Sequence, residues 1–522
     1  METHFPYVII GAGPAGVQLS YFLGKAGLNH MLVERSDRAS DFFRTYPRHR
    51  KLLSINKVHT GIQDPETNLR WDWNSLLSDE YEPLLKERTA KYFPDAASFV
   101  DYLGDFVTRH DIELATEFDV ESIDRYPASR RFEVRARDGR VLTADRLILA
   151  TGLSLPWVPD IEGIEHAEHY ASVSVDPADF VNKRVLIIGK GNSAFETAEN
   201  LVETAASIHL VSPSQVRFAW QTHFVGNLRA VNNNFLDTYL LKAQNAVLDA
   251  TIAGIEKVGD EFAVTFGYTH AHGEIETLRY DRIIACTGFQ FDASSFSDRL
   301  RPELTPCGRL PKMTHEWEST SISDLFFAGT LMQYRDYKKC MSSFVHGFRY
   351  NVRALAHMLR GRYHGEAWPT THVDPSVSSI RSAILARVNR SSGIWLQPGF
   401  LADFIHVDLS AADATYYSEI PFDYAREILM TRGSWISTSL EYGRDHSFDP
   451  FSHERVHRSD VTHATSSAFL HPVVRYFVDG EQVADLALGE VMTGRPGAAG
   501  VEAEAGDAGQ LLEVEIDAEF EH

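Results

Sequence analysis

Two short apolar runs that end in glycine-rich turns stand out in the hydrophobic pattern of the chain. Residues 7–20 read YVIIGAGPAGVQLS, and residues 185–198 read VLIIGKGNSAFETA. Each run predicts a buried strand, and the apolar positions after each turn predict the start of a helix. We therefore predict strand 7–10, turn 11–16, a helix to about residue 25 and strand 30–34, with a second such unit that begins near residue 176.

The rest of the chain alternates between predicted strands, helices and polar loops. A helix is expected around residues 96–108, and alternating strands follow it up to residue 152. A polar and aromatic insertion, VRFAWQTHFVGNLRAVNNNFLDTYLLKAQNAVL, interrupts the second unit. A helix from about residue 341 to 359 is predicted from apolar residues spaced by about 3.6 positions, namely Phe344, Val345, Phe348, Val352, Leu355 and Leu359.

This order predicts an α/β fold with two Rossmann-like dinucleotide-binding domains, the first interrupted by the second, and a C-terminal region. Residues 1–175 and 291–364 form the first domain, and residues 176–290 form the second domain with its insertion. Residues 365–495 form a region whose fold the pattern does not reveal. Residues 496–522 are acidic and are predicted to be a disordered tail.

The glycine spacing of the first turn indicates a dinucleotide site. Gly11 permits the tight bend, Gly13 lets backbone N–H groups approach a pyrophosphate, and Gly16 permits close packing of helix on strand. The pyrophosphate would lie at the helix N-terminus, where unpaired N–H groups favour an anion. Glu34, 23 positions after Gly11, ends the next strand, where a carboxylate accepts from ribose hydroxyls. We assign this site to FAD, with further contacts predicted at Pro14, Ala15, Arg35, Arg44, Gly152, Gly329 and Thr330.

The second turn repeats the pattern but has no acid at the matching position. Its motif is Gly189, Gly191 and Ala194, with Asn192 and Ser193 as further predicted contacts, and 23 positions after Gly189 stands Ser212. A carboxylate there would repel a 2′-phosphate by several kcal/mol at a distance of about 5 Å. Serine therefore favours NADPH, although NADH stays open. Arg217 is a candidate phosphate partner, with a solvated surface charge as the alternative.

Charge and composition exclude several classes of function. The formal net charge of −22 argues against binding to nucleic acid or to an anionic membrane. No apolar run approaches the ~20 residues that span a bilayer, and the first strand begins too early for a signal segment. A cytoplasmic location is therefore expected. Cys286, Cys307 and Cys340 are far apart in the sequence, which argues against a local dithiol relay.

The motifs resemble those of two-dinucleotide-binding flavoproteins, especially flavin-containing monooxygenases and N-hydroxylases. The matching stretches are GAGPAG, GKGNSAFE, ATGLSLP and ACTGF. Longer stretches, among them TYPRHRKLLSINK, WQTHFVGNLRAVNNNFLDTY and FLHPVVRYF, resemble the FAD-dependent oxidoreductase domain-containing proteins over about residues 5 to 490. Animal members of that family reside in the endoplasmic reticulum. This chain lacks a signal peptide and a retention-type ending, so that location is not carried over.

The resemblance implies a flavin monooxygenase. NADPH would reduce FAD, reduced flavin would form a C4a-hydroperoxide with oxygen, and an oxygen atom would pass to a small nucleophilic substrate, expected to be an amine nitrogen. Asn56 matches an asparagine placed near the flavin in such enzymes, with a loop asparagine as the alternative. His346 is a second catalytic candidate, with a core histidine as the alternative. Thr330 and Ser343 would contact flavin where the 341–359 helix begins, because its dipole favours negative charge there.

One other enzymatic function stays open. The chain would alternatively be an FAD-dependent NAD(P)H oxidoreductase that passes electrons to a protein or another acceptor. A non-enzymatic protein that retains the fold is disfavoured by the intact glycines. The predicted partners are the small-molecule substrate and molecular oxygen, without nucleic acid or membrane, and a homo-oligomer stays open.

The insertion and a group of C-terminal histidines complete the candidates. The insertion is expected to cover the nicotinamide as a lid, with Trp220, Gln221, His223, Asn227, Arg229 and Asn232 to Asn234 as its candidate residues. The histidines are His446, His453, His457, His463 and His471. They have no acid or cysteine partner that completes a recognisable metal site, so no metal is predicted.

Overall fold

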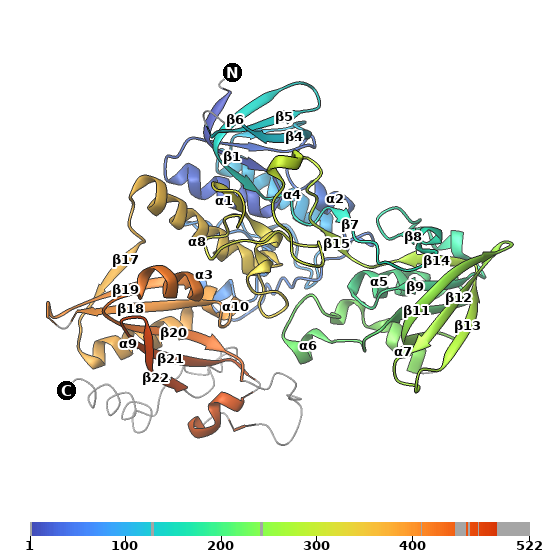
Figure 1. Cartoon of the computed structure of the whole chain (residues 1–522). Helices are drawn as coiled ribbons and strands as arrows, with labels where there is room; N and C mark the ends of the chain where they lie inside the picture. The colour runs from blue at the N-terminus through green and yellow to red at the C-terminus, as the bar shows by residue number, and fades with distance from the viewer. Residues whose placement is uncertain are drawn as a thin grey trace.

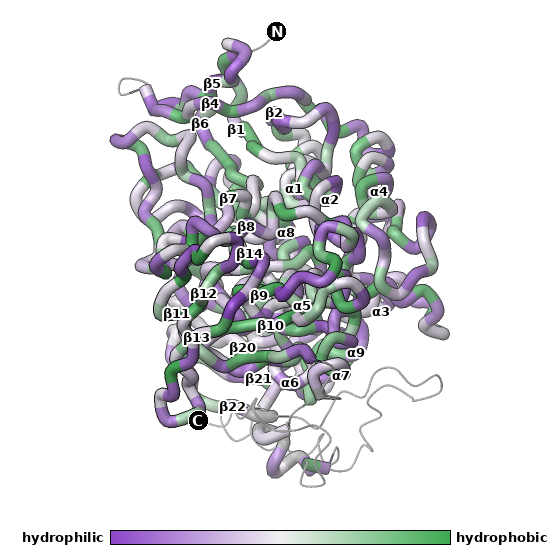
Figure 2. Tube along the Cα trace, turned by 90° about the vertical axis from the view of Figure 1, so that its right-hand side faces the viewer, coloured by the Kyte–Doolittle hydropathy of each residue, from purple (hydrophilic) through white to green (hydrophobic). Residues whose placement is uncertain are grey.

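The computed structural model describes residues 3–126, 130–240, 244–408, 410–443, 456–457, 460–467 and 469–487. Three lobes, each built on its own sheet, make up the molecule (Figure 1). Hydrophobic residues run along the inner strands of these sheets, as the tube along β9 and β10 shows (Figure 2). The helices and strands predicted for the two glycine-rich units are present, and the predicted α/β fold class is confirmed.

The first lobe carries a seven-stranded sheet with the order β3-β2-β1-β6-β5-β4, and β16 pairs with β6. Its strands are β1 (His4–Ile10), β2 (His30–Val33), β3 (Leu114–Ala115), β4 (Val120–Arg125), β5 (Phe132–Ala136), β6 (Val141–Leu149) and β16 (Leu325–Phe327). β1 and its parallel neighbours are buried on both faces, which explains the uninterrupted apolar run in the sequence. Because β16 lies beside β6, the chain returns to its first sheet after building the second.

The helices of the first lobe are α1 (Pro14–Lys25), α2 (Asp41–Thr45), α3 (Pro65–Asn68), α4 (Ala96–Arg109) and α8 (Val345–His364). α8 begins four residues after its predicted start and ends five residues after its predicted end. It starts late because residues 341–344 form a turn, in which Phe344 N donates to the Met341 carbonyl at 2.9 Å. It ends where Gly365 adopts φ +68°, a left-handed conformation suited to glycine.

The second lobe carries the other predicted nucleotide unit. Its strands are β8 (Glu168–His169), β9 (Arg184–Ile188), β10 (Ser207–Ser212), β11 (Ala246–Val258), β12 (Glu261–Tyr268), β13 (Ile275–Tyr280) and β14 (Arg282–Ala285), in the order β13-β12-β11-β10-β9-β14-β8. Helices α5 (Asn192–Leu201), α6 (Ala219–Thr222) and α7 (Asn234–Leu240) belong to it. β7 (Leu155–Pro156) pairs with β15 (Phe289–Gln290) where the chain passes between the two lobes.

The C-terminal lobe is an antiparallel sheet that the sequence pattern did not predict. Its six strands are β17 (Thr370–Val373), β18 (Leu401–Asp408), β19 (Asp413–Pro421), β20 (Ser434–Glu441), β21 (His471–Val478) and β22 (Glu481–Ala487). Their order is β17-β19-β18-β20-β21-β22. Helices α9 (Val377–Arg390), α10 (Gly393–Leu396) and α11 (Phe422–Tyr424) accompany it, and α8 lies between this lobe and the first one (Figure 1).

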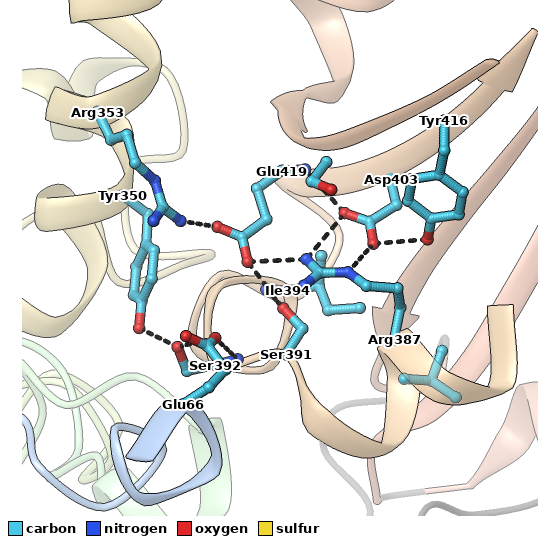
Figure 3. Close-up of polar contacts among 12 residues, drawn as sticks. Glu66, Tyr350, Arg353, Arg387, Ser391, Ser392, Ile394, Asp403, Tyr416 and Glu419 are labelled. Atoms are coloured by element: carbon cyan, nitrogen blue, oxygen red, sulfur yellow. Dashed lines mark hydrogen bonds and ion pairs between the residues drawn. The ribbon is translucent and has the colours of Figure 1, made fainter. Parts of the chain in front are cut away.

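A buried network of charged side chains fastens the C-terminal lobe to the first lobe (Figure 3). Glu419 of β19 binds Arg353 of α8 and lies 3.0 Å from Nη2 of Arg387 on α9. Arg387 also binds the buried Asp403, at 2.7 Å. Burial by itself would raise the pKa of Glu419, but the two guanidinium groups more than offset this and lower that pKa. The Arg353–Glu419 pair therefore joins α8 to the ion pairs within the C-terminal lobe.

Candidate active site between the two glycine-rich turns

One cavity of about 1330 Å³ reaches both glycine-rich turns. Gly11 and Gly13 line it from the first lobe, and Gly189 and Gly191 line it from the second. In sheets of this kind, ligands bind beyond the carboxyl ends of the parallel strands. Two dinucleotides bound at these turns would therefore enter the same cavity from two sides.

The glycines of both turns divide into those that the protein's own packing requires and those that face empty space. A Cβ atom on Gly11 would lie 2.8 Å from the Ala150 carbonyl oxygen, and one on Gly16 would lie 1.9 Å from the Gly11 carbonyl oxygen. A Cβ on Gly189 would lie 2.4 Å from the Cys286 carbonyl oxygen. Gly13 and Gly191 have no heavy atom within 4 Å of that position among the described residues. These two glycines leave room at the cavity wall for a ligand.

Three helices begin at this cavity without a side-chain cap. The N-cap residues are Gly13 for α1, Gly191 for α5 and Phe344 for α8, and all three line the cavity. None of the three N-termini has a side-chain cap hydrogen bond within the part of the chain that the structure describes. Unpaired N–H groups and helix dipoles favour negative charge at such positions. The cavity therefore suits two pyrophosphates and an anionic ring near α8.

Glu34 lines the cavity at the end of β2, as its position in the sequence predicted. Its Oε2 accepts a hydrogen bond from Ala12 N at 2.8 Å, and its Oε1 accepts one from Ser36 N at 3.1 Å. The side chain is buried. These bonds fix the carboxylate, and each oxygen retains a lone pair that can accept from a ribose hydroxyl.

Asn192 ties the insertion to the second glycine-rich turn. Its Nδ2 donates to the Asn227 carbonyl at 2.8 Å, and its Oδ1 accepts from Arg229 N at 3.0 Å and from Asn232 Nδ2 at 3.2 Å. Phe224 of the insertion lines the cavity. Asn192 therefore anchors the insertion beside the second glycine-rich turn, a contact that the sequence did not reveal.

The insertion also contacts the other two lobes. Arg229 Nε donates to the Leu53 carbonyl at 3.4 Å, and its guanidinium lies 5.2 Å from the Trp73 ring centroid. His223 stacks on Tyr442 of the C-terminal lobe, with ring centroids 3.8 Å apart. The insertion therefore lies where all three lobes meet.

Arg48 bridges the two nucleotide lobes. Its guanidinium donates to the carbonyls of Ala171 and Val173 at 2.5 and 2.6 Å, and its backbone N donates to the Tyr170 hydroxyl at 3.0 Å. The Tyr170 hydroxyl in turn donates to Glu196 Oε1. These contacts connect the loop after α2 to the second lobe.

Glu196 is a cavity residue that the sequence analysis missed, although it lies in the GKGNSAFE motif. Its side chain is buried, and it lines the cavity two positions after Ala194. Burial raises the pKa of Glu196 to about 7, and the Tyr170 hydroxyl partly offsets that rise. A carboxyl of this kind can hold or release a proton near neutral pH.

The two predicted catalytic residues lie outside the cavity wall of the described structure. The Asn56 amide donates to the Thr89 carbonyl at 2.9 Å, so it satisfies local backbone. His346 is fully buried and stacks on Trp73, with centroids 4.5 Å apart. Burial holds the pKa of His346 well below its usual range, which keeps the imidazole neutral. In both cases the geometry matches the alternative stated above. Asn74, which the sequence analysis missed, is an asparagine that does line the cavity.

Most of the other predicted site residues line the cavity, and four do not. Those that line the cavity are Gly11, Gly13, Pro14, Ala15, Glu34, Arg35, Gly152, Gly189, Gly191, Asn192, Ser193, Ser212, Gly329 and Thr330. Gly16 and Ala194 pack inside the protein. Arg44 pairs with Asp37 at 2.7 Å, and Arg217 is exposed. Neither lines the cavity in the part of the chain that the structure describes.

Thr330 and Ser343 meet at the start of α8. Thr330 Oγ1 donates to the Ser343 carbonyl at 3.2 Å, and both residues line the cavity. The Ser343 hydroxyl is buried without a hydrogen-bond partner among the described residues. A buried polar atom of this kind fits a ligand that supplies the missing partner.

These features fit FAD at the first turn and a nicotinamide dinucleotide at the second. Gly13 and Gly191 leave open space for a pyrophosphate at each turn. The fixed carboxylate of Glu34 and the unpaired Ser343 hydroxyl can form hydrogen bonds with FAD. FAD when bound supplies hydride and electron transfer, which no side chain can perform. The protein contributes binding, orientation and exclusion of water.

Comparisons with known proteins agree with this assignment. The family model described as pyridine nucleotide-disulphide oxidoreductase matches residues 8–329. FAD-dependent oxidoreductase domain-containing protein 2 of Mus musculus is 38% identical over 513 residues, which cover 91% of this chain and 76% of the relative. The protein of the same name from Danio rerio is 36% identical over 532 residues, which cover 90% and 75%. The solved flavin-containing monooxygenase from Stenotrophomonas maltophilia aligns with a TM-score of 0.52 at 20% identity, over 69% of this chain and 99% of that one.

The fold, the site and these matches define a flavin-dependent oxidoreductase that uses FAD and NAD(P)H. The chain belongs to the pyridine nucleotide-disulphide oxidoreductase family. The resemblance to the FAD-dependent oxidoreductase domain-containing proteins is confirmed.

Several features outside the cavity complete the description. Cys286 and Cys340 are buried, Cys307 is exposed, and all three thiols are free. His463 pairs with Asp460 at 2.9 Å, whereas His446 and His453 lie outside the described residues. Among the residues described, no three His, Cys, Asp or Glu side chains form a metal site. Within the same residues, no helix has the length and hydropathy needed to cross a bilayer.

Proposed function

We propose that the protein is an NADPH-dependent flavin monooxygenase that transfers one oxygen atom to a small nucleophilic substrate, an amine nitrogen in the first instance. In this proposal NADPH binds at the second turn and reduces FAD at the first. Reduced flavin then reacts with oxygen to give the C4a-hydroperoxide that is the oxygen donor. We place this reaction where α8 begins, beside Thr330, Ser343 and Asn74.

The single cavity shared by both glycine-rich turns carries the proposal. It reaches both turns, and the insertion adds Phe224 to its wall. Oxygen transfer requires a flavin sheltered from water, and the anchored insertion supports such shelter. The three cysteines form no disulfide, and Cys286 is the one that lines the cavity, so an internal dithiol relay has no support among the described residues.

The names of several relatives also support oxygen transfer. The probable indole-3-pyruvate monooxygenase YUCCA1 of Arabidopsis thaliana is 30% identical over 220 residues, which cover 40% of this chain. The amine substrate rests on the resemblance to N-hydroxylases stated above, and cytoplasmic location stays a prediction from the sequence.

Rapid mixing of the NADPH-reduced, FAD-loaded protein with oxygenated buffer tests the proposal. We expect a transient absorbance band of a C4a-hydroperoxide before oxidised flavin returns. Addition of an amine substrate should shorten the life of this band and yield hydroxylated product that mass spectrometry detects. Direct return to oxidised flavin, with fast reduction of an added electron acceptor, would instead indicate a reductase.

A further inference from the structure

The turn that follows β10 is where the second nucleotide's adenosine ribose is expected. Ser212 ends β10, and Ser212, Pro213 and Lys190 line the cavity there. Ser212 Oγ donates to the Ser214 carbonyl at 3.1 Å, which closes the turn. The discrimination between a 2′-hydroxyl and a 2′-phosphate must be made by the groups around this turn.

Lys190, the middle residue of the Gly189–Gly191 motif, reaches this turn with its ammonium group. Its Nζ donates to the Ser214 carbonyl at 3.1 Å and forms an ion pair with Asp249. Only 4% of the side chain is exposed, so it is held in the protein rather than extended into water. Burial lowers the pKa of Lys190, and Asp249 partly offsets this.

Asp249 holds Lys190 and a second basic side chain beside the turn. Asp249 on β11 is in register with Ser212 on β10. Its other carboxylate oxygen lies 3.6 Å from Nε2 of His270. Thr269 Oγ1 donates to the Pro213 carbonyl at 3.1 Å. This bond holds the turn after β12 against the turn after β10. Lys190 and His270 thus lie on either side of one carboxylate, next to Ser212, and the ion pair with Lys190 offsets the repulsion that this carboxylate would exert on a 2′-phosphate.

An ammonium group has three N–H donors, and the two bonds above leave one of them for a ligand. A phosphate can accept this donor in a charge-assisted hydrogen bond, which is stronger than a bond between neutral groups. Arg217 offers no comparable geometry, because it is exposed and lies outside the described cavity wall.

We propose that Lys190, positioned by Asp249, is the residue that recognises the 2′-phosphate of NADPH, with His270 as the outer member of the same site. The inference rests on the NADPH preference in the proposed function. It replaces Arg217 as the phosphate partner. It also makes coenzyme choice a property of the glycine-rich turn itself, not of the segment after β10.

Binding of two nucleotide fragments to the FAD-loaded full chain tests the inference. The probes are 2′,5′-ADP, which carries the 2′-phosphate, and 5′-AMP, which lacks it, with dissociation constants measured by isothermal titration calorimetry. In Lys190→Met we expect 2′,5′-ADP to bind about 10- to 100-fold more weakly, the value of one charge-assisted hydrogen bond, with 5′-AMP changed less than about threefold. Lys190→Arg should recover much of the loss, and Lys183→Met, at an exposed lysine before β9, should cause none.

Equal weakening of both fragments in Lys190→Met, or no weakening, would overturn the assignment, as would a selective loss in Arg217→Met. A thermal unfolding curve close to that of the parent chain establishes that Lys190→Met is folded, and Lys190→Arg provides a second folded variant. Because fragment binding needs no reaction with oxygen, its outcome is independent of whether the protein is a monooxygenase or a reductase.

Discussion

Asn192 in the second glycine-rich turn accepts a hydrogen bond from the backbone N of Arg229 in the insertion, at 3.0 Å. The two residues are 37 positions apart in the chain. Arg229 in turn lies over the Trp73 ring of the first lobe. The motif that is expected to bind the nicotinamide nucleotide is thus also the anchor of the segment that we expect to cover it.

Replacement of Asn192 by alanine should slow flavin reduction by NADPH at least about tenfold without loss of bound FAD. The substitution removes bonds to buried backbone groups, each worth about 1–3 kcal/mol when left unmade, so the insertion would no longer be held over the cavity. Stopped-flow reduction and the flavin content of the purified protein provide the measurements. Asn200→Ala, on the same helix but bonded to Val175, is the matched control. An unchanged reduction rate in Asn192→Ala would show that the anchor has no role in hydride transfer.

Ser212→Glu should weaken NADPH binding far more than NADH binding. An added carboxylate about 5 Å from a 2′-phosphate repels it, and even a partly screened effect of ~2 kcal/mol is about a thirtyfold loss of affinity. Titration of protein fluorescence with each coenzyme measures the two constants, and Ser212→Gln controls for side-chain size. If both coenzymes lose affinity equally, the residue does not face the 2′ position.

Gly13→Ala and Gly16→Ala should differ in their effects on FAD binding and on stability. A methyl group on Gly13 points into open space at the cavity wall, so the variant should fold but bind FAD weakly. A methyl group on Gly16 would collide with the Gly11 carbonyl oxygen at 1.9 Å, so that variant should lose stability as well. Flavin content and thermal unfolding separate the two effects. Gly24→Ala, where a Cβ makes ordinary contact at 3.7 Å, should keep the flavin content and should not lower stability. Normal flavin content in Gly13→Ala would contradict the assignment of the first turn.

The stability difference between Glu196→Gln and the parent chain should depend on pH. Burial raises the pKa of Glu196 to about 7, above that of an unfolded glutamate near about 4.3, so the folded state holds the proton more tightly. The stabilisation from this proton is complete below about pH 4.3 and is lost as pH rises through about 7. Relative to the parent chain, Glu196→Gln should therefore gain stability from about pH 5 to about pH 8. Urea unfolding at several pH values measures this, with Glu203→Gln as an exposed control. A flat difference for Glu196→Gln would contradict the raised pKa.

Loss of the Glu419 charge should loosen the C-terminal lobe. Glu419→Gln leaves the partly buried Arg353 and Arg387 without their shared anion, and we expect a loss of stability below the roughly 3–5 kcal/mol of a fully buried ion pair. Thermal unfolding should shift to lower temperature, and limited proteolysis should cleave first between residues 365 and 443. Glu427→Gln, at an exposed position further along the chain, is the control. An unfolding curve like that of the parent would mean that the Arg353–Glu419 ion pair contributes little to holding the two lobes together.

The glycine-rich units could be predicted because all their determinants lie within about 30 contiguous residues. A strand, a turn with glycines at fixed positions and a helix form the site together, so the sequence alone is enough to identify Gly11, Gly13, Gly189 and Gly191. Helix α8 could be predicted equally well from its apolar spacing, because five of its six predicted apolar residues belong to the core of the first lobe.

Residues whose role depends on a distant partner could not be assigned in this way. The sequence pattern indicates Asn56 and His346 as catalytic candidates. In the structure the Asn56 amide donates to the Thr89 carbonyl, and His346 stacks on the Trp73 ring. The six-stranded C-terminal sheet was not predicted either, since its central strand β18 pairs with two later strands, β19 and β20, that lie on opposite sides of it in the sheet.

By itself, the sequence determined the two nucleotide sites, the α/β class and the choice of FAD and NAD(P)H, because local backbone geometry encodes them. Only the tertiary structure decided which side chains complete those sites. Lys190 meets Asp249 across 59 positions, and Tyr170 meets Glu196 across 26. Such pairs form only when strands and loops that are distant in the sequence pack together. The local pattern of hydrophobic and polar residues does not indicate which side chains will then be neighbours.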